Sequence, residues 1–361
     1  MPVASLTATK LRWLARHEPE NARRVAAVCL PHDWLSWRLA GYGPDSGAQA
    51  LHELRTDRSD ASGTGYFSSA SGAYLPEVLG QTLGHVPVLP QVLGPLEAAG
   101  KTPSGALIGA GAGDNAAAGL GVNAGLGDVV ISLGTSGTVF AVASTPSADA
   151  RGLVAGFADA SGHYLPLACT LNATRVFDAT AAMLAVSLGE LSELALTAPS
   201  GAGGLTLLPY FEGERTPNLP DATGSLHGLT LANFTPANLA RACFEGVVCS
   251  LADGLAALEA QGVVAERIIL VGGGAQSPAV RQIAVEVFGL PVIVPSPGEY
   301  VADGAARQAA GLLNGKLPEW PLESVRLSVK PGNEHGGENH EASPVLAQYR
   351  HWASTAHPRI P

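Results

Sequence analysis

The sequence predicts an α/β protein. Short β-rich segments alternate with capped helices, and Arg267–Val271, a glycine-rich loop and Pro278–Phe288 follow one another in the strand–loop–helix order of that class. Glycine supplies 44 of the 361 residues, which favours tight turns and close packing of the backbone. At about 150 residues per domain, the length indicates about two domains.

Charge and cysteine content argue against several classes of protein. The net charge is −10, and the chain has no basic stripe, so we expect neither a nucleic-acid nor a membrane partner. The four cysteines lack C-x-x-C spacing, which favours reduced thiols in a cytoplasmic protein over a zinc or redox site. No apolar run reaches about 18 residues, and the N-terminus has no signal-peptide pattern.

The first part of the chain is expected to be mainly helical and irregular. Spaced apolar residues predict helices over Lys10–Arg16 and Arg24–Leu39, and a short helix is expected over Tyr74–Leu83. The segment Thr56–Gly65 is dense in turn and capping residues. Three tryptophans are expected to anchor the core: Trp13, Trp34 and Trp37.

The middle of the chain has strand patterns. A strand over Ala106–Gly111 is expected to lead into the turn Gly113-Asp114-Asn115 and a helix over Ala116–Leu120. The β-rich runs Asp128–Leu133 and Thr138–Ala143 flank a small polar loop, and this order predicts a hairpin.

The clearest helix is predicted over Thr235–Gln261. Thr235 can cap it, Pro236 occupies the first helical position, and Gly262 provides the stop. A strand over Val292–Val294 and a helix over Asp303–Leu313 follow. The polar run Lys330–Ser343 is expected to be a mobile loop, with a short closing helix over Pro344–Ala353.

Four segments could carry chemistry. In GAGAGDNAAAGLG, small neighbours would let a substrate approach the carboxylate of Asp114, although this segment taken alone favours a turn Asp that bonds its own backbone. In SLGTSG, glycines and hydroxyls could cradle phosphate, or form a plain hairpin turn. The strand–glycine–helix segment LVGGGAQS suits a nucleotide, or close helix–strand packing.

The fourth segment is the loop LPYFEGERTPNLPDATG. Glu212, Glu214 and Arg215 suggest a shaped loop that holds a charge pair near a cleft, or a solvated surface ion pair. The histidines have no metal-binding spacing, and His32 is expected to be structural.

Taken in order, these segments resemble one family. PHDWLSWRLAG, TDRSDASGTGYF, GDNAA, SLGTSGTVF, GERTP and LVGGGAQS are similar to the motifs of the FGGY carbohydrate kinases, over about residues 5–315. SDASGT, GDNAA, SLGTSG and GERTP together are most similar to the xylulose kinases of that family.

The resemblance implies the actin-like sugar-kinase fold, with an RNase-H-like C-terminal domain and an incomplete N-terminal domain. It implies a sugar-binding remainder over 1–122, a nucleotide-binding domain over 123–317, and a mobile tail with a short closing helix over 318–361. The implied reaction transfers the γ-phosphoryl group of ATP, with Mg²⁺, to a primary hydroxyl of a ketopentose, most closely D-xylulose. A small-molecule sugar and ATP are thus the implied partners. The resemblance leaves open whether the protein forms a homodimer.

The resemblance also implies roles for single residues. Asp114 matches the catalytic base and contacts the substrate, and Asn115 matches a sugar contact. No metal ligand is assigned. The implied nucleotide contacts are Gly134, Thr135 and Ser136 on the phosphate side and Gly273, Gly274, Ala275 and Ser277 on the adenosine side, and Glu214 and Arg215 line the cleft.

One departure from the family pattern bears on activity. Met1–Thr7 joins that pattern in mid-domain, and the preceding part of the family carries a first phosphate loop whose Asp is expected to help hold Mg²⁺. We therefore expect little activity from the isolated chain.

Alternatives remain open: another FGGY kinase, for ribulose, gluconate or glycerol, or a non-catalytic remnant that binds nucleotide. An NAD oxidoreductase is disfavoured, because GGGAQS lacks the required glycine spacing and no acidic residue follows at the required distance.

Overall fold

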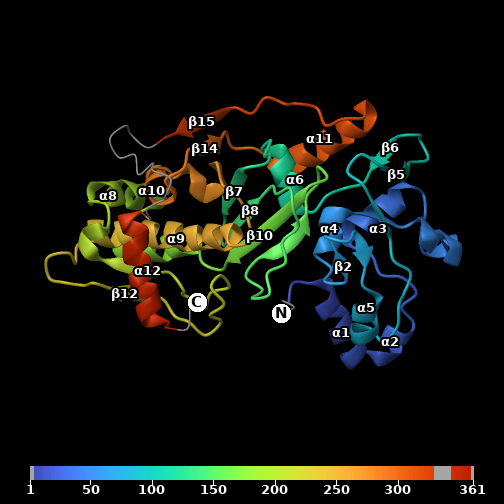
Figure 1. The fold of residues 1–361 in the computed structure, drawn as a ribbon, viewed down its shortest axis with the longest axis horizontal. Coiled ribbons are helices and arrows are strands. Elements are labelled where there is room, and N and C mark those ends of the chain that lie inside the picture. The colour runs from blue at the N-terminus through green and yellow to red at the C-terminus, as the bar shows by residue number, and fades with distance from the viewer. Residues whose placement is uncertain (1–3, 329–342, 359–361) are drawn as a thin grey trace. The chain divides into compact units, whose positions relative to one another are not determined.

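The structure is a computed structural model that describes residues 4–328 and 343–358 (Figure 1). These residues form two compact units that interleave along the chain. The first unit comprises 4–126, 142–166 and 298–321, and the second comprises 127–141, 167–297, 322–328 and 343–358.

The first unit opens with a small helical layer made of α1 (Thr7–His17), α2 (Pro19–Arg23) and α5 (Pro76–Thr82). Proline occupies the first helical position of α2 and α5, where its missing N–H costs no hydrogen bond. Apolar side chains from these helices and from Tyr66 form one core: Ala8, Leu11, Ala22, Tyr66, Leu79 and Leu83.

A second group of elements in the first unit surrounds two parallel strands. β1 (Arg55–Asp57) pairs with β4 (Gln91–Leu93), and α3 (Pro31–Leu39) packs against β1. Helix α4 (Arg58–Ser62) follows β1 directly. The shorter elements of this unit are η1 (Pro44–Ser46), η2 (Ala48–Glu53), β2 (Phe67–Ser68), β3 (Ala73–Tyr74), β5 (Ala98–Lys101), β6 (Leu107–Gly109) and β9 (Ala155–Ala158).

Two helices far apart in sequence pack closely in the first unit. α6 (Asp114–Gly121) lies against α11 (Tyr300–Asn314), as Figure 1 shows. Glycine permits this approach, because a Cβ at Gly304 would overlap the carbonyl of Ala117, and a Cβ at Gly121 would overlap that of Tyr300. The close backbone contact holds α6, whose first residue is Asp114, against α11.

The second unit is built on a mixed sheet with the order β15-β14-β13-β7-β8-β10. β7 (Asp128–Leu133) and β8 (Gly137–Ala141) form an antiparallel hairpin, and β13 (Arg267–Val271) runs parallel to β7. β10 (Tyr164–Thr170) pairs antiparallel with β8. The outer strands are β14 (Val292–Pro295) and β15 (Ser324–Leu327).

Helices pack around this sheet and around one another. α9 (Pro236–Glu259) contacts β8, and α7 (Thr174–Leu184), α8 (Leu188–Thr197) and α10 (Pro278–Phe288) pack on α9 (Figure 1). The C-terminal α12 (Pro344–Ala356) lies against α9 and against β11 (Thr206–Leu208), which pairs with β12 (Ser225–His227).

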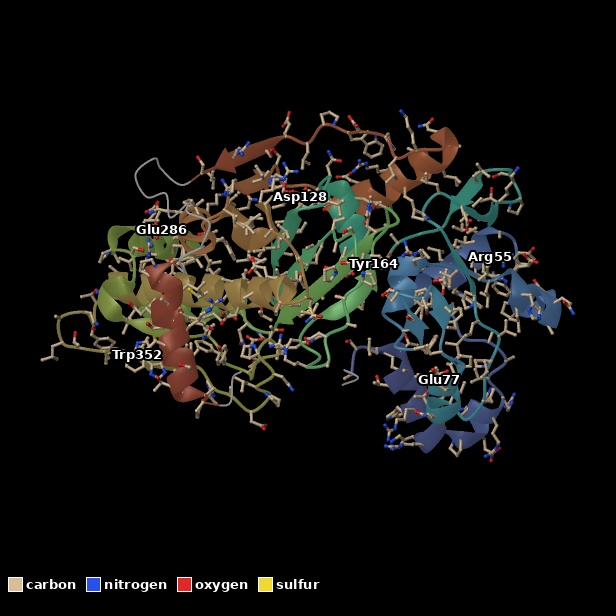
Figure 2. The ribbon with its side chains drawn as sticks, in the orientation of Figure 1. Arg55, Glu77, Asp128, Tyr164, Glu286 and Trp352 are labelled. Atoms are coloured by element: carbon tan, nitrogen blue, oxygen red, sulfur yellow. The ribbon has the colours of Figure 1, made fainter. Side chains whose placement is uncertain are left out.

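Long-range side-chain contacts secure these outer helices. Figure 2 labels Glu286 on α10, which pairs with the buried Arg241 of α9. It also labels Trp352 on α12, whose ring stacks on His227 at 5.0 Å between centroids.

Several sequence predictions are confirmed. The hairpin forms as expected, α10 spans the predicted residues, and α9 begins at Pro236 with the side chain of Thr235 accepting a hydrogen bond from the Asn238 N–H. Of the cysteines, Cys243 and Cys249 are buried. Within the described parts of the chain, no single helix is long and apolar enough to cross a membrane; α7 and α8 meet that criterion only as a pair bent by 86°.

Other predictions are wrong. Residues 24–30 are not helical; Leu30 has ψ 163°, because Pro31 disfavours the helical conformation in the residue before it. Trp37 is 3% exposed and anchors a core, but Trp13 and Trp34 are 55% and 44% exposed. Trp13 stacks on His17, and Trp34 lies beside Trp37. The loop predicted over Lys330–Ser343 lies outside the described residues except for Ser343.

The close packing of α6 and α11 predicts an unusual response to Gly304→Ala. In most helix interiors this change stabilises by up to about 1 kcal/mol. At Gly304 the new methyl group would overlap the Ala117 carbonyl, so we expect destabilisation in urea unfolding. Gly80→Ala is the matched control, because Gly80 lies in α5 with open space around it. If Gly304→Ala were as stable as Gly80→Ala, the proposed close contact would be wrong.

Candidate functional site

Asp114 is the first residue of α6 and is exposed. Its Oδ1 accepts hydrogen bonds from the backbone N–H of Asn115 at 2.7 Å and from Asn115 Nδ2 at 3.0 Å. Within the described residues, no group donates to Oδ2, which is therefore available to a ligand. The first helical position also suits a carboxylate, because the N-terminal end of a helix favours negative charge.

The loop that leads into Asp114 is held by a buried glutamine. Gln308 of α11 is 3% exposed. Its Oε1 accepts a hydrogen bond from the Gly111 N–H at 3.0 Å, and its Nε2 donates to the Gly111 carbonyl at 2.6 Å. Gly111 has φ +88°, a conformation that glycine adopts without strain.

A serine and an aspartate hold the next turn of the same loop. The Gly113 N–H donates to Ser59 Oγ at 2.9 Å, and Ser59 Oγ donates to Asp57. Asp57 is 3% exposed and caps α4, where its carboxylate also accepts hydrogen bonds from the backbone N–H groups of Ser59 and Asp60. The residue before Asp114 is thus connected to a buried carboxylate.

His32 lies among three carboxylates. Its Nδ1 is 2.7 Å from Asp60 Oδ2 and 3.3 Å from Asp33 Oδ1, and its Nε2 is 3.6 Å from Asp57 Oδ1. Hydrogen-bond geometry is not met at either nitrogen, so these contacts are ionic. A Cβ at Gly111 would overlap the His32 ring, so the ring packs directly on the Gly111 backbone.

This group is the arrangement of the described residues that most resembles a metal site. One ligand atom each from His32, Asp57 and Asp60 lie within 4.8 Å of one another. Mg²⁺ prefers oxygen ligands and retains several waters, whereas here an imidazole occupies a mostly buried position with both nitrogens facing carboxylates. The group therefore does not suit Mg²⁺.

In the second unit, the Gly134–Ser136 turn joins β7 to β8. The Gly134 N–H donates to the Ser136 carbonyl at 3.1 Å, which closes the turn. The carbonyls of Gly134 and Thr135 accept hydrogen bonds from the N–H groups of Thr174 and Ala173 at the start of α7. The Thr135 and Ser136 side chains are exposed, so their hydroxyls can meet an anionic ligand.

The residues of the turn after β13 differ in their exposure and in the room that they leave for a side chain. Gly273 is exposed, and a Cβ there would meet no atom within 4 Å. Gly274 and Ala275 are buried, and a Cβ at Gly274 would lie 2.8 Å from the Leu133 Cβ. Ser277 caps α10 and donates to Ser192 Oγ at 2.9 Å. Gly273 is thus the position in this turn open to a ligand, while the other three support the turn.

Glu214 is an internal brace of its loop. It is 1% exposed, and burial raises the pKa of its carboxyl above the ordinary value despite several hydrogen bonds. Its Oε1 accepts from the N–H of Leu171 at 2.6 Å and of Arg215 at 2.7 Å, and its Oε2 accepts from Asn172 Nδ2 at 3.0 Å. These bonds tie the loop to the connection between β10 and α7, which in turn holds the Gly134–Ser136 turn.

The charge pair expected in this loop is placed differently. Arg215 contacts Glu214 through its backbone, and the ion pair of the loop joins Glu212 to Arg175 of α7. Both partners of that pair are substantially exposed, so salt screens it and it contributes little stability.

Sequence reasoning missed the buried partners of the loops. Asp57 with Ser59, Asn172 and Gln308 fall in three separate parts of the chain, and no spacing rule joins them. His32 is expected to be structural, but its three carboxylate neighbours were not predicted. The density of capping residues in Thr56–Gly65 was the one available signal, and it marks α4 and the cap formed by Asp57.

Family models match nearly the whole chain. Residues 3–134 match the FGGY family of carbohydrate kinases, N-terminal domain, and residues 129–312 match its C-terminal domain. The chain is 45% identical to the xylulose kinase of Streptomyces rubiginosus, covering 96% of this chain and 72% of that protein. It is also 45% identical to the xylulose kinase of Streptomyces coelicolor, covering 88% and 63%.

A solved structure matches as well. The xylulose kinase from Bifidobacterium adolescentis superimposes with a TM-score of 0.90 and 46% identity, covering 98% of this chain and 73% of that one. The chain thus spans between 63% and 73% of the length of these three proteins. The predicted α/β, actin-like sugar-kinase fold is confirmed by these matches.

The role of Glu214 as a brace predicts a large stability difference within one loop. Glu214→Ala would remove the acceptor of the partly buried N–H groups of Leu171 and Arg215 and of the buried Asn172 amide, so we expect a loss on the order of 3 kcal/mol in urea unfolding. Glu212→Ala removes only an exposed ion pair, and its expected cost is below about 1 kcal/mol. Equal stability of the two variants would contradict the assignment.

Proposed function

The chain belongs to the FGGY family of carbohydrate kinases, and from that premise we propose that it serves ATP-dependent phosphorylation of D-xylulose to D-xylulose 5-phosphate. The choice of D-xylulose as substrate rests on the 45% identity to two xylulose kinases over 96% and 88% of this chain. The reducing cytoplasm, which supplies ATP, suits a chain whose described cysteines form no disulfide.

Asp114 is the proposed catalytic base. Phosphoryl transfer depends mainly on positioning and on charge neutralisation, so a carboxylate that orients the acceptor hydroxyl and accepts its proton suffices. The free Oδ2 of Asp114 offers that acceptor, while Asn115 holds Oδ1. Asn115 is then both a brace for the base and a proposed contact of the sugar.

The second unit supplies the proposed nucleotide contacts. The exposed hydroxyls of Thr135 and Ser136 can donate hydrogen bonds to phosphate oxygens, and the open surface at Gly273 permits close approach of adenosine. ATP enters as its magnesium complex, in which the metal neutralises phosphate charge. No residue of this chain is assigned to that metal.

A coupled assay with ATP, Mg²⁺ and D-xylulose tests the substrate. One protein is the 361-residue chain. The other carries in addition the part of the Streptomyces rubiginosus xylulose kinase that this chain does not match. From the longer protein we expect ADP release that depends on D-xylulose and exceeds that with ribulose, gluconate or glycerol, and from the 361-residue chain we expect little. If neither protein phosphorylated D-xylulose, or if another sugar were preferred, the proposal would be wrong.

The base is tested by Asp114→Asn in the protein that turns over. We expect kcat to fall by about 10²–10⁴-fold, because the amide cannot accept the hydroxyl proton. Glu77→Gln, at an exposed residue of α5, serves as a control for the loss of one carboxylate. A kcat near that of the unmodified protein would contradict the assignment, and a raised KM alone would indicate a binding role.

The nucleotide surface is tested by Gly273→Phe. A phenylalanine side chain would fill the open space over this turn, so we expect ADP to bind at least about tenfold more weakly in calorimetry, roughly 1.4 kcal/mol. Gly274 is less suitable, because its neighbours leave no room for a side chain. Gly189→Phe, on the open surface of α8, is the matched control, and equal affinity of the two variants would refute the site.

A further inference from the structure

We propose that His32, as a positively charged imidazolium, is a positioning residue for the loop that ends in Asp114. The inference rests on the proposed function, in which Asp114 is the catalytic base. The contacts of His32 lead to the backbone of Gly111 and Gly113 rather than to Asp114 itself. Two separate routes connect the ring to this loop.

The first route is direct packing. The His32 ring lies against Gly111, where a Cβ would overlap ring atoms, and Gln308 hydrogen-bonds the backbone of the same residue. Gly111 is therefore fixed between an aromatic ring and a buried amide. A ring that moved away would leave the backbone supported by Gln308 alone.

The second route is a chain of polar contacts. His32 Nε2 faces Asp57 Oδ1, Asp57 accepts from Ser59 Oγ, and Ser59 Oγ accepts from the Gly113 N–H. Asp57 is nearly inaccessible to water, so its carboxylate has few alternative partners. The position of that carboxylate consequently sets the position of the residue that precedes Asp114.

The charges around His32 explain why its own charge matters. From its own helix it faces Asp33, which is 1% exposed, and from β1 and α4 it faces Asp57 and Asp60. The Gly111 backbone that packs on the ring carries no charge. The negative charge of Asp33 also acts on two neighbouring groups. Burial, followed by this charge, raises the pKa of Cys29 to about 11 and raises the pKa of Tyr66.

Without the imidazolium, three carboxylates would face one another with no cation between them. Burial already raises the pKa of Asp33, to about 6, and that of Asp57. The repulsion would therefore favour either uptake of a proton by one of these carboxyls or movement of Asp57 or Asp60 toward water. Either movement would weaken the support of Gly113, since both side chains belong to the α4 turn that holds Ser59.

The protonation state fits this role. Burial lowers the pKa of His32, but the contact with Asp60 and the charges of Asp33, Asp60 and Asp57 outweigh it and raise the pKa to about 9. The ring is then charged at neutral pH. Because the folded-state pKa lies above the ordinary 6.5, its stabilising contribution is complete below that value and is lost as the pH rises through about 9.

Three variants separate the effect of the His32 charge from that of side-chain packing. Each is made in the protein that phosphorylates D-xylulose. His32→Gln removes the charge, His32→Lys keeps it, and Gln308→Met removes the neutral clamp on the other side of Gly111. For His32→Gln we expect kcat at pH 7.5 to fall on the order of 10- to 100-fold, with KM for ATP unchanged. We expect His32→Lys to recover most of this loss.

The pH profile distinguishes positioning by charge from simple structural damage. The unmodified protein should lose kcat above an apparent pKa of about 9. That alkaline limb should be absent from His32→Gln and displaced upward in His32→Lys. Gln308→Met should lower kcat but keep the limb, because Gln308 carries no charge.

Two nuclear magnetic resonance measurements on the folded chain do not depend on turnover. The His32 ring should titrate near pH 9, and the Gly113 amide should exchange with solvent faster in His32→Gln than in the unmodified protein at the same pH. A ring pKa below 7.5, or equal exchange rates, would overturn the proposal even if a variant failed to fold for assay.

The kinetic outcomes are equally decisive. An unchanged kcat and pH profile in His32→Gln would overturn the proposal, and so would equal losses in His32→Gln and His32→Lys. Failure of the proposed function has a different signature, since Asp114→Asn would then retain its kcat while the ring titration and Gly113 exchange behaved as expected.

Discussion

Loops that present backbone groups to a ligand cannot also be held by a regular ladder of backbone hydrogen bonds. In this protein, buried polar side chains hold them instead. Gln308 and the Asp57–Ser59 pair hold the loop before Asp114, and Glu214 with Asn172 holds the connection that supports the Gly134–Ser136 turn. Each of these side chains spans elements far apart in sequence, so the loops depend on the folded unit around them.

This arrangement accounts for how an acidic protein can serve a polyanionic substrate. The carboxylates of Glu214 and Asp57 are engaged with other protein groups, and the groups that face outward include one carboxylate oxygen of Asp114, the hydroxyls of Thr135 and Ser136 and the Gly273 backbone. Hydroxyls and backbone N–H groups can donate hydrogen bonds to phosphate oxygens. Preorganised polar groups of this kind are what phosphoryl transfer requires, because its transition state gains most from positioning and from compensation of charge.

The sequence predicted the elements whose signals are local. The Thr235 cap and Pro236 define the start of α9, and the GTSG turn between two β-rich runs defines the hairpin. Apolar spacing alone misplaced Trp13 and Trp34, because it does not say which face of a helix is covered. The motif order identified the loops, but the partners of their backbones, such as Gln308 for Gly111, come from tertiary packing and leave no local pattern.

The most direct test of the account is a crystal structure with D-xylulose and ADP bound. The account predicts a xylulose hydroxyl within about 2.6–3.2 Å of Asp114 Oδ2, with Asn115 still bonded to Oδ1 and the ADP phosphates contacting Thr135 or Ser136. It also predicts that Gly111 and Gly113 keep their bonds to Gln308 and Ser59. A bound sugar that left Asp114 facing solvent, or phosphates held away from the Gly134–Ser136 turn, would contradict it.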